Sequence, residues 1–443
     1  MSYARASNTP TNHLGFRTEH RNVDASSFPH VCCGGYAARW HTDSERTSTV
    51  HLYEPDTRDF HETNPSVTAY GRLVEGDILR LPEEDRKAIS SGQLWDDRRY
   101  NYEIVAEDKR DFIEAGIQFW KENSCIDFKE VSSDSSLPRV QFVAEKGCWS
   151  NVGCVAKAQG SRTQKLSIGS GCSGLGTVTH EIGHSLGFFH EQSRSDRDRY
   201  VSILWENIEA SGKSNFERVT TTEHHGVPYD LSSVMHYGKH FFSSNGKPTI
   251  LTLDPTRQGL IGQRVQPSFR DVSLMNRLYK CEELCPRRPA CHNGGYVSAD
   301  CRCHCPPGTS GADCGRVTGS YYPEPTCGGT VTTEGALTSP GWPGVYPAGA
   351  DCVWWIKPPA GRRAQVAFTK FDILYRVNED GCYFEHLDVK NTGIMGEAER
   401  YCGTDLANKN LEARGPDGDM VLHFKAYRKH YAGTGFAAEV KFV

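Results

Sequence analysis

The apolar residues in the middle of the chain form patterns that predict both helices and strands. Between positions 110 and 122 they stand at helical spacing and predict an amphipathic helix: Phe112, Ile113, Ile117, Phe119 and Trp120. Short runs of β-favouring residues predict strands in three segments: 102–105, 140–143 and 165–168. A second helix is expected over 177–186, ending at Gly187, which tolerates a positive φ. Residues 100–280 are therefore expected to mix helices and strands.

The two ends of the chain have other patterns. Residues 1–60 are polar, rich in Ser, Thr, His and Arg, and without a period, which predicts a leader that is disordered or wrongly assigned. From 327 to 443, alternating strands separated by Gly and Pro turns predict a β-sandwich. A chain of 443 residues is long enough for about three domains.

Charge and cysteine content narrow the class of protein. Fifty basic and 55 acidic residues give a net charge of −5, which favours neither a nucleic-acid partner nor a membrane surface, and no apolar run is long enough to span a bilayer. Seventeen cysteines indicate an oxidising compartment. The first thirty residues contain no apolar signal-peptide core. We therefore expect a secreted protein whose start is incomplete or wrongly assigned.

The strongest candidate for chemistry is the stretch H-E-I-G-H-S-L-G-F-F-H-E. On a helix, His180 and His184 lie one turn apart on the same face and can bind one metal ion. Glu181 stands beside them, where a carboxylate can take a proton from water. A turn at Gly187 brings His190 back as a third ligand, and three protein ligands leave an open position, which is typical of a catalytic Zn²⁺ site.

The residues from His180 to Asp198 resemble the signature of the astacin family of metzincin peptidases. The resemblance implies a two-lobed α+β catalytic domain over 88–281, with a cleft between the lobes. Ser233-Val234-Met235-His236-Tyr237 resembles the Met-turn of that family, which implies that Met235 lies under the metal and that Tyr237 is a mobile ligand that stabilises the oxyanion. The alternative for both residues is ordinary core packing.

The segment 61–87 resembles an astacin prosegment. Val74-Glu75-Gly76-Asp77 is similar to the motif F-x-G-D, whose Asp binds the zinc, although Val74 replaces the preferred Phe. The resemblance implies that Asp77 is a zymogen switch; the alternative is a simple turn. The dibasic pair Arg86-Lys87 predicts cleavage before Ala88, and the resemblance implies that the new amino terminus pairs with Glu191 through water.

The cysteines indicate two further modules and several disulfides. The family resemblance implies the pairs Cys125–Cys281 and Cys148–Cys172 in the catalytic domain. Residues 285–315 resemble an EGF-like module, whose connectivity stays open: Cys285, Cys291, Cys301, Cys303, Cys305 and Cys314. A metal-binding knuckle is the alternative there. Cys154 belongs to none of these pairs; it is expected to be a free thiol or to form a disulfide with Cys32, Cys33 or another chain.

Residues 327–443 resemble a CUB domain with the disulfides Cys327–Cys352 and Cys382–Cys402. Many CUB domains bind calcium, and Glu385 and Asp419 are the candidate ligands here. Ile261-Gly262-Gln263-Arg264 resembles the astacin segment whose Arg faces the S1′ pocket. Arg264 would then select Asp or Glu after the cleaved bond; the alternative is a surface ion pair.

The sequence as a whole predicts a secreted zinc endopeptidase, made as a zymogen, with extracellular matrix or precursor proteins as substrates. One Zn²⁺ is expected as the cofactor. The rival hypothesis is a catalytically silent protease fold that acts as a binding platform through its EGF-like and CUB modules. The complete set of candidate residues argues against that rival.

Overall fold

The computed structural model describes residues 64, 68–80, 94–158, 160–220, 223–374, 382, 385–427 and 433–443. The leader with Cys32 and Cys33, and the expected cleavage site before Ala88, lie outside these residues. Among the described helices none combines the length and the apolar character needed to cross a membrane.

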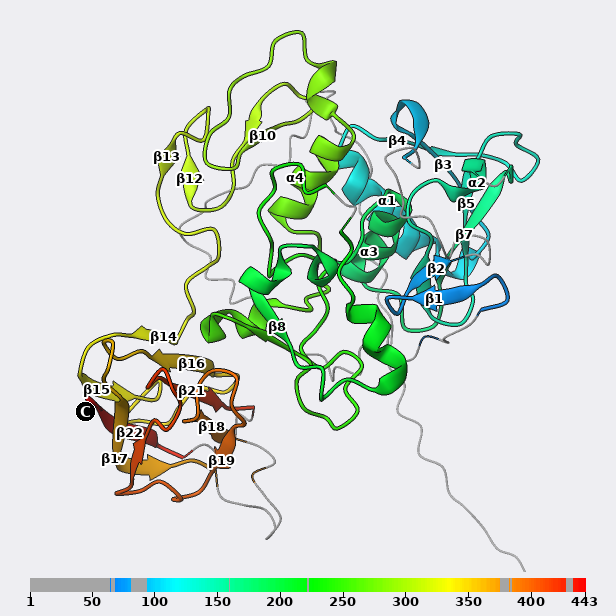
Figure 1. Ribbon diagram of the computed structural model, residues 1–443. Helices are drawn as coiled ribbons and strands as arrows, with labels where there is room; N and C mark the ends of the chain where they lie inside the picture. The colour runs from blue at the N-terminus through cyan, green and yellow to red at the C-terminus, as the bar shows by residue number, and fades with distance from the viewer. Residues whose placement is uncertain are drawn as a thin grey trace, which may run out of the picture. The chain divides into compact units, whose positions relative to one another are not determined.

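The first lobe of the catalytic region is built on a seven-stranded sheet (Figure 1). Its strands, in spatial order, are β1 (Arg72–Val74), β2 (Ile78–Arg80), β6 (Cys148–Ser150), β7 (Thr163–Ile168), β5 (Arg139–Val143), β3 (Arg99–Ile104) and β4 (Asp127–Glu130). β3, β5 and β7 confirm the three predicted strands. β1 and β2 form an antiparallel hairpin, and Ile78 of β2 pairs in parallel with Ser150 of β6. The described part of the expected prosegment thus forms an added edge of this sheet.

Two helices pack against each other beside the sheet. α1 (Arg110–Asn123) buries Ile113, Ile117 and Trp120, whereas Phe112 is 43% exposed and lies outside the apolar face. α3 (Leu175–Ser185) is buried along its described length except at its first residue. The short α2 (Val155–Ala158) precedes β7. A disulfide joins Cys125, just after α1, to Cys281 near the end of the region, and a second joins Cys148 to Cys172.

The second lobe consists mostly of loops around an aromatic core. Its regular elements are the antiparallel pair β8 (Val201–Ile203) and β9 (Ile250–Thr252), and the helix α4 (Phe269–Leu278). Phe216, Tyr229, Tyr237 and Phe241 are buried together in its core. α4 begins with a reciprocal capping box, in which Ser268 and Asp271 each accept a hydrogen bond from the backbone N–H of the other. The two-lobed α+β fold expected from the sequence is confirmed.

A small disulfide-rich module, residues 285–317, follows the catalytic region. It has two β-ribbons: β10 (Tyr296–Val297) with β11 (Cys303–His304), and β12 (Thr309–Ser310) with β13 (Arg316–Val317). Its six cysteines form the disulfides Cys285–Cys301, Cys291–Cys303 and Cys305–Cys314, which gives the connectivity that the sequence left open. Tyr296 is buried against Phe269 of α4, with ring centroids 5.4 Å apart.

The C-terminal region is a sandwich of two sheets, as predicted. One sheet contains β14 (Gly328–Val331), β16 (Asp351–Ile356), β21 (Met420–Lys425), β18 (His386–Lys390) and β19 (Glu399–Tyr401). The other contains β15 (Gly335–Thr338), β22 (Gly435–Phe442), β17 (Ala364–Asp372) and β20 (Asn410–Glu412). Trp354 of one sheet meets Phe436 of the other in the shared core, 5.5 Å between centroids. The region contains the disulfides Cys327–Cys352 and Cys382–Cys402.

Candidate metal centre

Two helical histidines and one loop histidine converge on a single point. α3 presents His180 and His184 on one face, with their Nε2 atoms 3.1 Å apart. Gly187 adopts a φ of +116° after the helix, and this turn redirects the chain so that His190 returns to the other two. The three side chains are at most 1% exposed. The structure therefore brings together the three ligands that the sequence predicted.

Each imidazole is oriented through its Nδ1 atom. His180 Nδ1 lies 2.7 Å from the carbonyl oxygen of Val234, and His184 Nδ1 lies 2.7 Å from that of Phe188. Carbonyl oxygens only accept, so both Nδ1 atoms must be the protonated donors. His190 Nδ1 lies 2.9 Å from Oε2 of Glu75. The Nε2 atoms are then left as lone-pair donors, which is the tautomer that a zinc ligand needs.

Asp77, which precedes β2, lies together with the three histidines. One carboxylate oxygen lies 3.1 Å from His180 Nε2, and the other lies 3.4 Å from His184 Nε2 and 3.2 Å from His190 Nε2. The four ligand atoms are mutually within 4.8 Å. Lone pairs so close together repel unless a cation lies between them. Ligand atoms around a tetrahedral zinc ion with bonds of about 2.05 Å are about 3.3 Å apart, close to the distances found here. The residues present therefore fit Zn²⁺.

Glu181 lies in the same buried site. Its side chain is fully buried, and neither carboxylate oxygen has a hydrogen-bond partner among the described residues. Burial raises the pKa of this carboxyl well above its usual value, and the charge of Asp77 raises it further, while Arg264 opposes the shift. A buried carboxyl group with a strongly shifted pKa is a candidate functional group.

The Met-turn residues lie below and beside the histidines. Met235 is 2% exposed, and its sulfur would be 3.2 Å from a Cβ placed on Gly183, which directly precedes His184. The Tyr237 ring lies 4.7 Å from the ring of His190 and stacks on Phe241 at 4.4 Å. Both residues pack in the core and also border the metal centre. Core packing therefore does not exclude the role at the metal that the resemblance implies for them.

Glu75 is a site residue that the sequence analysis missed. It is 6% exposed, and its Oε2 accepts a hydrogen bond from Ser193 Oγ at 3.1 Å besides its contact with His190. Positive φ angles at Glu75 (48°) and Gly76 (76°) form a tight turn that directs the carboxylates of Glu75 and Asp77 towards one histidine. The only signal in the sequence was the pairing of two acids around one glycine.

Glu191 is held inside the protein. Its side chain accepts hydrogen bonds at Oε1 from the backbone N–H of Asp230 (2.7 Å) and from Arg194 (3.3 Å). Burial raises its pKa to about 8, against the opposing charge of Arg194. Arg194 also forms a bidentate pair with Asp196, at 3.0 Å for both bonds. This network is structural, and the proposed amino-terminal partner of Glu191 lies outside the described residues.

The guanidinium of Arg264 is close enough to the metal centre to affect its charged groups. Its Nη1 donates to the carbonyl oxygens of His236 (3.0 Å) and Gln263 (2.9 Å), while its buried Nη2 has no hydrogen-bond partner among the described residues. Burial is the main cause of the lowered pKa of His180, and the positive charge of Arg264 lowers it further. The same charge opposes the rise in the pKa of Glu181. The ion pairs of the described residues do not include Arg264, so it is not the surface ion pair of the alternative interpretation.

The candidate calcium ligands do not meet. β18 and β21 are antiparallel, with His386 opposite Lys425 and Lys390 opposite Val421. Glu385 precedes His386 at one end of this ladder, and Asp419 precedes Met420 at the other end. The length of β21 separates them, about 20 Å of strand. Glu385 and Asp419 therefore cannot bind one ion together, which the sequence spacing could not reveal because it does not give the register of the sheet. Calcium binding by this domain stays a prediction. Cys154 is buried in the catalytic core, 5% exposed.

Together, the fold and the geometry define a two-lobed metallopeptidase centre with three histidine ligands. Residues 87–280 match the model of the peptidase family Astacin, and residues 327–439 match the CUB domain. The zinc metalloproteinase dpy-31 of Caenorhabditis elegans is 32% identical over 430 residues, which cover 90% of this chain and 70% of that protein. The chain belongs to the astacin family.

Two further proteins are similar to this chain. Blastula protease 10 of Paracentrotus lividus is 33% identical over 398 residues, or 83% of this chain and 64% of that protein. High choriolytic enzyme 1, a hatching enzyme zinc-protease from Oryzias latipes, is a solved structure with 35% identity and a TM-score of 0.40 that covers 44% of this chain and 98% of that chain. The chain spans 60 to 64% of the length of the first three curated relatives.

Proposed function

We propose that this protein is a secreted zinc metalloendopeptidase that is made as a zymogen. The observation that carries the proposal is the convergence of three histidine Nε2 atoms beside a buried Glu181 that has no hydrogen-bond partner among the described residues. A structural zinc site would use a fourth protein ligand permanently, whereas the fourth candidate ligand here, Asp77, belongs to a segment that we propose is removed.

Zn²⁺, when bound by His180, His184 and His190, would act as a Lewis acid and lower the pKa of water towards about 7. Glu181 accepts the proton of the attacking water and later delivers it to the leaving amine. Removal of Asp77 takes away a negative charge that raises the pKa of Glu181, so the mature site favours the ionised base. Tyr237, whose ring lies next to that of His190, would donate a hydrogen bond to the developing oxyanion.

The prosegment explains latency in this proposal. Asp77 occupies the ligand position that the open site needs, and β2 fixes it there by pairing with β6 of the catalytic sheet. Glu75 contacts His190 and Ser193 from the neighbouring position. Cleavage near Ala88 would release both carboxylates together.

Arg264 provides the proposed specificity for an acidic P1′ residue. Its buried Nη2 is desolvated, and a substrate carboxylate would supply the acceptor that it lacks among the described residues. Secretion is supported by the seven disulfides found in the described residues, because such bonds persist in oxidising compartments. Extracellular matrix or precursor proteins are the proposed substrates, and the C-terminal modules would select among them.

The decisive experiment compares the activated protein with its Glu181→Ala variant on a quenched peptide that carries Asp at P1′. We expect equal zinc content and a loss of kcat of roughly 10²- to 10⁴-fold in the variant. A chelator should abolish the activity of the parent, and added zinc should restore it. Hydrolysis by Glu181→Ala within a few-fold of the parent would refute the role of Glu181. A zinc-loaded parent without activity would instead favour the binding-platform hypothesis.

A further inference from the structure

The first turn of α4 is connected to a metal ligand through the Met-turn. The Asp271 carboxylate accepts hydrogen bonds from Ser233 Oγ at 2.6 Å and from the backbone N–H of Val234 at 2.9 Å. The carbonyl oxygen of the same Val234 accepts the hydrogen bond of His180 Nδ1. The orientation of His180 therefore depends on where the N-terminus of α4 holds the backbone at 233–234.

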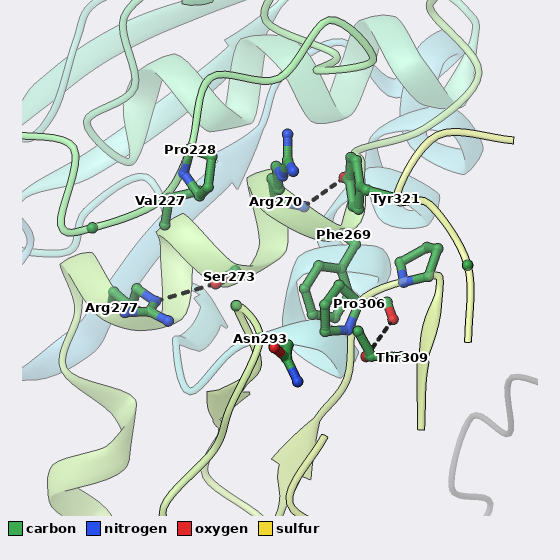
Figure 2. Close-up of a pocket in the computed structure, with 14 residues that line it drawn as sticks. Val227, Pro228, Phe269, Arg270, Ser273, Arg277, Asn293, Pro306, Thr309 and Tyr321 are labelled. Carbon is green, nitrogen blue, oxygen red and sulfur yellow. Dashed lines mark hydrogen bonds between the residues drawn. The ribbon is translucent and has the colours of Figure 1, made fainter. Parts of the chain in front are cut away.

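The outer side of this turn is covered by the segment that follows the disulfide-rich module. Tyr321 lies over the guanidinium of Arg270, 3.7 Å from ring centroid to Cζ, and its hydroxyl accepts a hydrogen bond from the Arg270 backbone N–H at 3.3 Å (Figure 2). The Tyr322 hydroxyl accepts from the backbone N–H of Leu231 at 2.9 Å and from Arg270 Nη1 at 3.3 Å. Tyr321 also lines a cavity of about 270 Å³ between α4 and the disulfide-rich module (Figure 2).

Both tyrosines donate their hydroxyl protons to Asp230. Tyr321 reaches Oδ2 at 3.0 Å and Tyr322 reaches Oδ1 at 3.2 Å. Burial, and next the charge of Asp230, raises the pKa of both phenols, so both keep their protons at physiological pH. Asp230 is 1% exposed and does not belong to any ion pair of the described residues. Its carboxylate is therefore stabilised by neutral donors.

The two tyrosines supply a large share of those donors. The others are Ser232, through its N–H (2.9 Å) and Oγ (2.7 Å), and Ser268 Oγ, the cap of α4, at 2.7 Å. Among the described residues, two of the five hydrogen bonds to this buried carboxylate thus come from Tyr321 and Tyr322. A buried carboxylate that loses donors moves towards others or towards water. Asp230 would then release the loop that leads directly into the Met-turn.

We propose that Tyr321 and Tyr322 are positioning residues of the metal centre, which fix Asp230 and the first turn of α4 and thereby the Met-turn that orients His180. The catalytic centre would then require a segment that lies outside the catalytic region in sequence. The expected effects on zinc affinity and activity rest on the proposed zinc-dependent function. The hydrogen bonds of the two tyrosines with Asp230 can be tested without metal.

The test uses the full chain with both tyrosines replaced, Tyr321→Phe together with Tyr322→Phe, which removes the hydroxyls and keeps the rings. Tyr401→Phe is the matched control, because that hydroxyl bonds to Glu399 within the C-terminal sandwich. We expect amide exchange at Leu231 and Val234 to accelerate at least tenfold in the double variant. The zinc Kd of the folded protein, measured by chelator competition, should rise roughly tenfold. After activation, kcat should fall while KM stays within about twofold.

The outcomes separate this inference from the proposed function. Exchange rates and zinc affinity within twofold of the parent would overturn the inference, even if the parent is a fully active protease. A parent without zinc or activity would overturn the proposed function, while the exchange rates still decide whether the tyrosines hold the loop. If the double variant does not fold, Tyr322→Phe alone should show about a threefold effect on exchange and zinc Kd. No effect in that variant would again contradict the inference.

Discussion

The Glu75 carboxylate lies 2.9 Å from Nδ1 of His190, while the carboxylate of Asp77 faces Nε2 of the same ring at 3.2 Å. One imidazole is thus held at both nitrogens by two acids of a single turn. Asp77 lies at the Nε2 side, where the metal would be. Glu75 lies at Nδ1 of His190, where His180 and His184 instead have a backbone carbonyl oxygen as acceptor. In the proposed zymogen, inhibition would therefore be divided between a blocked ligand position and a histidine held in place by Glu75.

This division predicts unequal effects of the two acids on latency. In the uncleaved zymogen, Asp77→Ala should raise the basal hydrolysis of a small peptide by roughly 100-fold, because it removes the group that occupies the site. Glu75→Gln weakens one charge-assisted hydrogen bond worth about 1.5 kcal/mol, so it should raise basal activity about tenfold. The measurement is the initial rate on protein shown by mass spectrometry to be intact.

Tyr70→Phe is the control for this pair, because Tyr70 anchors the same prosegment to Glu145 and Lys165 away from the histidines. It should leave the basal rate within about twofold. Equal basal rates for Glu75→Gln and the parent would show that the contact with His190 does not contribute to latency. Equal rates for Asp77→Ala and the parent would remove the zymogen switch altogether.

A second prediction concerns the choice of substrate. Arg264→Gln keeps a hydrogen-bonding side chain but removes the positive charge and the buried Nη2. The preference for Asp over Ala at P1′ should fall by about 10- to 100-fold in kcat/KM, which corresponds to roughly 1.5 to 3 kcal/mol for a hydrogen bond to a charged group. Competition between two peptides that differ only at P1′ measures the ratio directly.

Arg257→Gln is the matched control for this substitution. Arg257 pairs with Asp254 at 3.7 Å and donates to the carbonyl oxygen of Pro323, so it belongs to a different part of the second lobe. Its loss should not change the P1′ ratio. An unchanged ratio in Arg264→Gln would mean that the acidic preference, if the enzyme has one, comes from another cation.

The sequence predicted features that depend on local geometry and missed those that depend on long-range register. The His180–His184 spacing is a property of one helical turn, so the metal face could be derived directly. The separation of Glu385 from Asp419 depends on how β18 pairs with β21, which no local pattern encodes. Glu75 was overlooked because its partner His190 lies 115 residues away. The contact of Tyr321 and Tyr322 with Asp230 is non-local in the same sense.

A third prediction links the C-terminal sandwich to pH. Burial alone would raise the pKa of Asp388, but His386 and the bidentate Arg400, at 2.7 and 2.9 Å, outweigh it and hold the pKa well below its usual range. A depressed carboxyl pKa stabilises the fold above the unfolded value of about 3.9, and this stability is lost as the pH falls below it. Arg400→Gln should therefore cost about 1 kcal/mol near pH 7, since Arg400 is half exposed, and less near pH 3.

Amide exchange in β18 and β21, corrected for the intrinsic rate at each pH, measures the free energy of opening in this prediction. Lys441→Gln serves as the control, because its pair with Glu439 is exposed on both sides. It should change the opening free energy by less than about 0.5 kcal/mol at either pH. A cost of Arg400→Gln that stays constant from pH 7 to pH 3 would contradict the assignment to Asp388.

The last prediction concerns the packing of α1 on α3. A Cβ added at Gly116 would lie 2.5 Å from Cγ1 of Val178 and 3.2 Å from Cδ1 of Ile182, so the two helices meet with no room for a methyl group. Ala favours a helix over Gly by about 1 kcal/mol, but overpacking a core costs about 1 to 3 kcal/mol. Gly116→Ala should therefore destabilise the protein by about 1 kcal/mol, and it should weaken zinc binding because Val178 stands two residues before His180.

Two further variants decide whether overpacking is the cause. Gly259→Ala adds a methyl group in open space at an exposed position and should leave stability within about 0.5 kcal/mol. Val178→Ala removes the atom that the new methyl group would strike. Combined with Gly116→Ala, it should cost less than the sum of the two single changes, with an interaction energy of at least about 0.5 kcal/mol in chemical unfolding. Strict additivity would mean that α1 and α3 separate to accommodate the methyl group, and zinc affinity should then fall in both variants that contain Gly116→Ala.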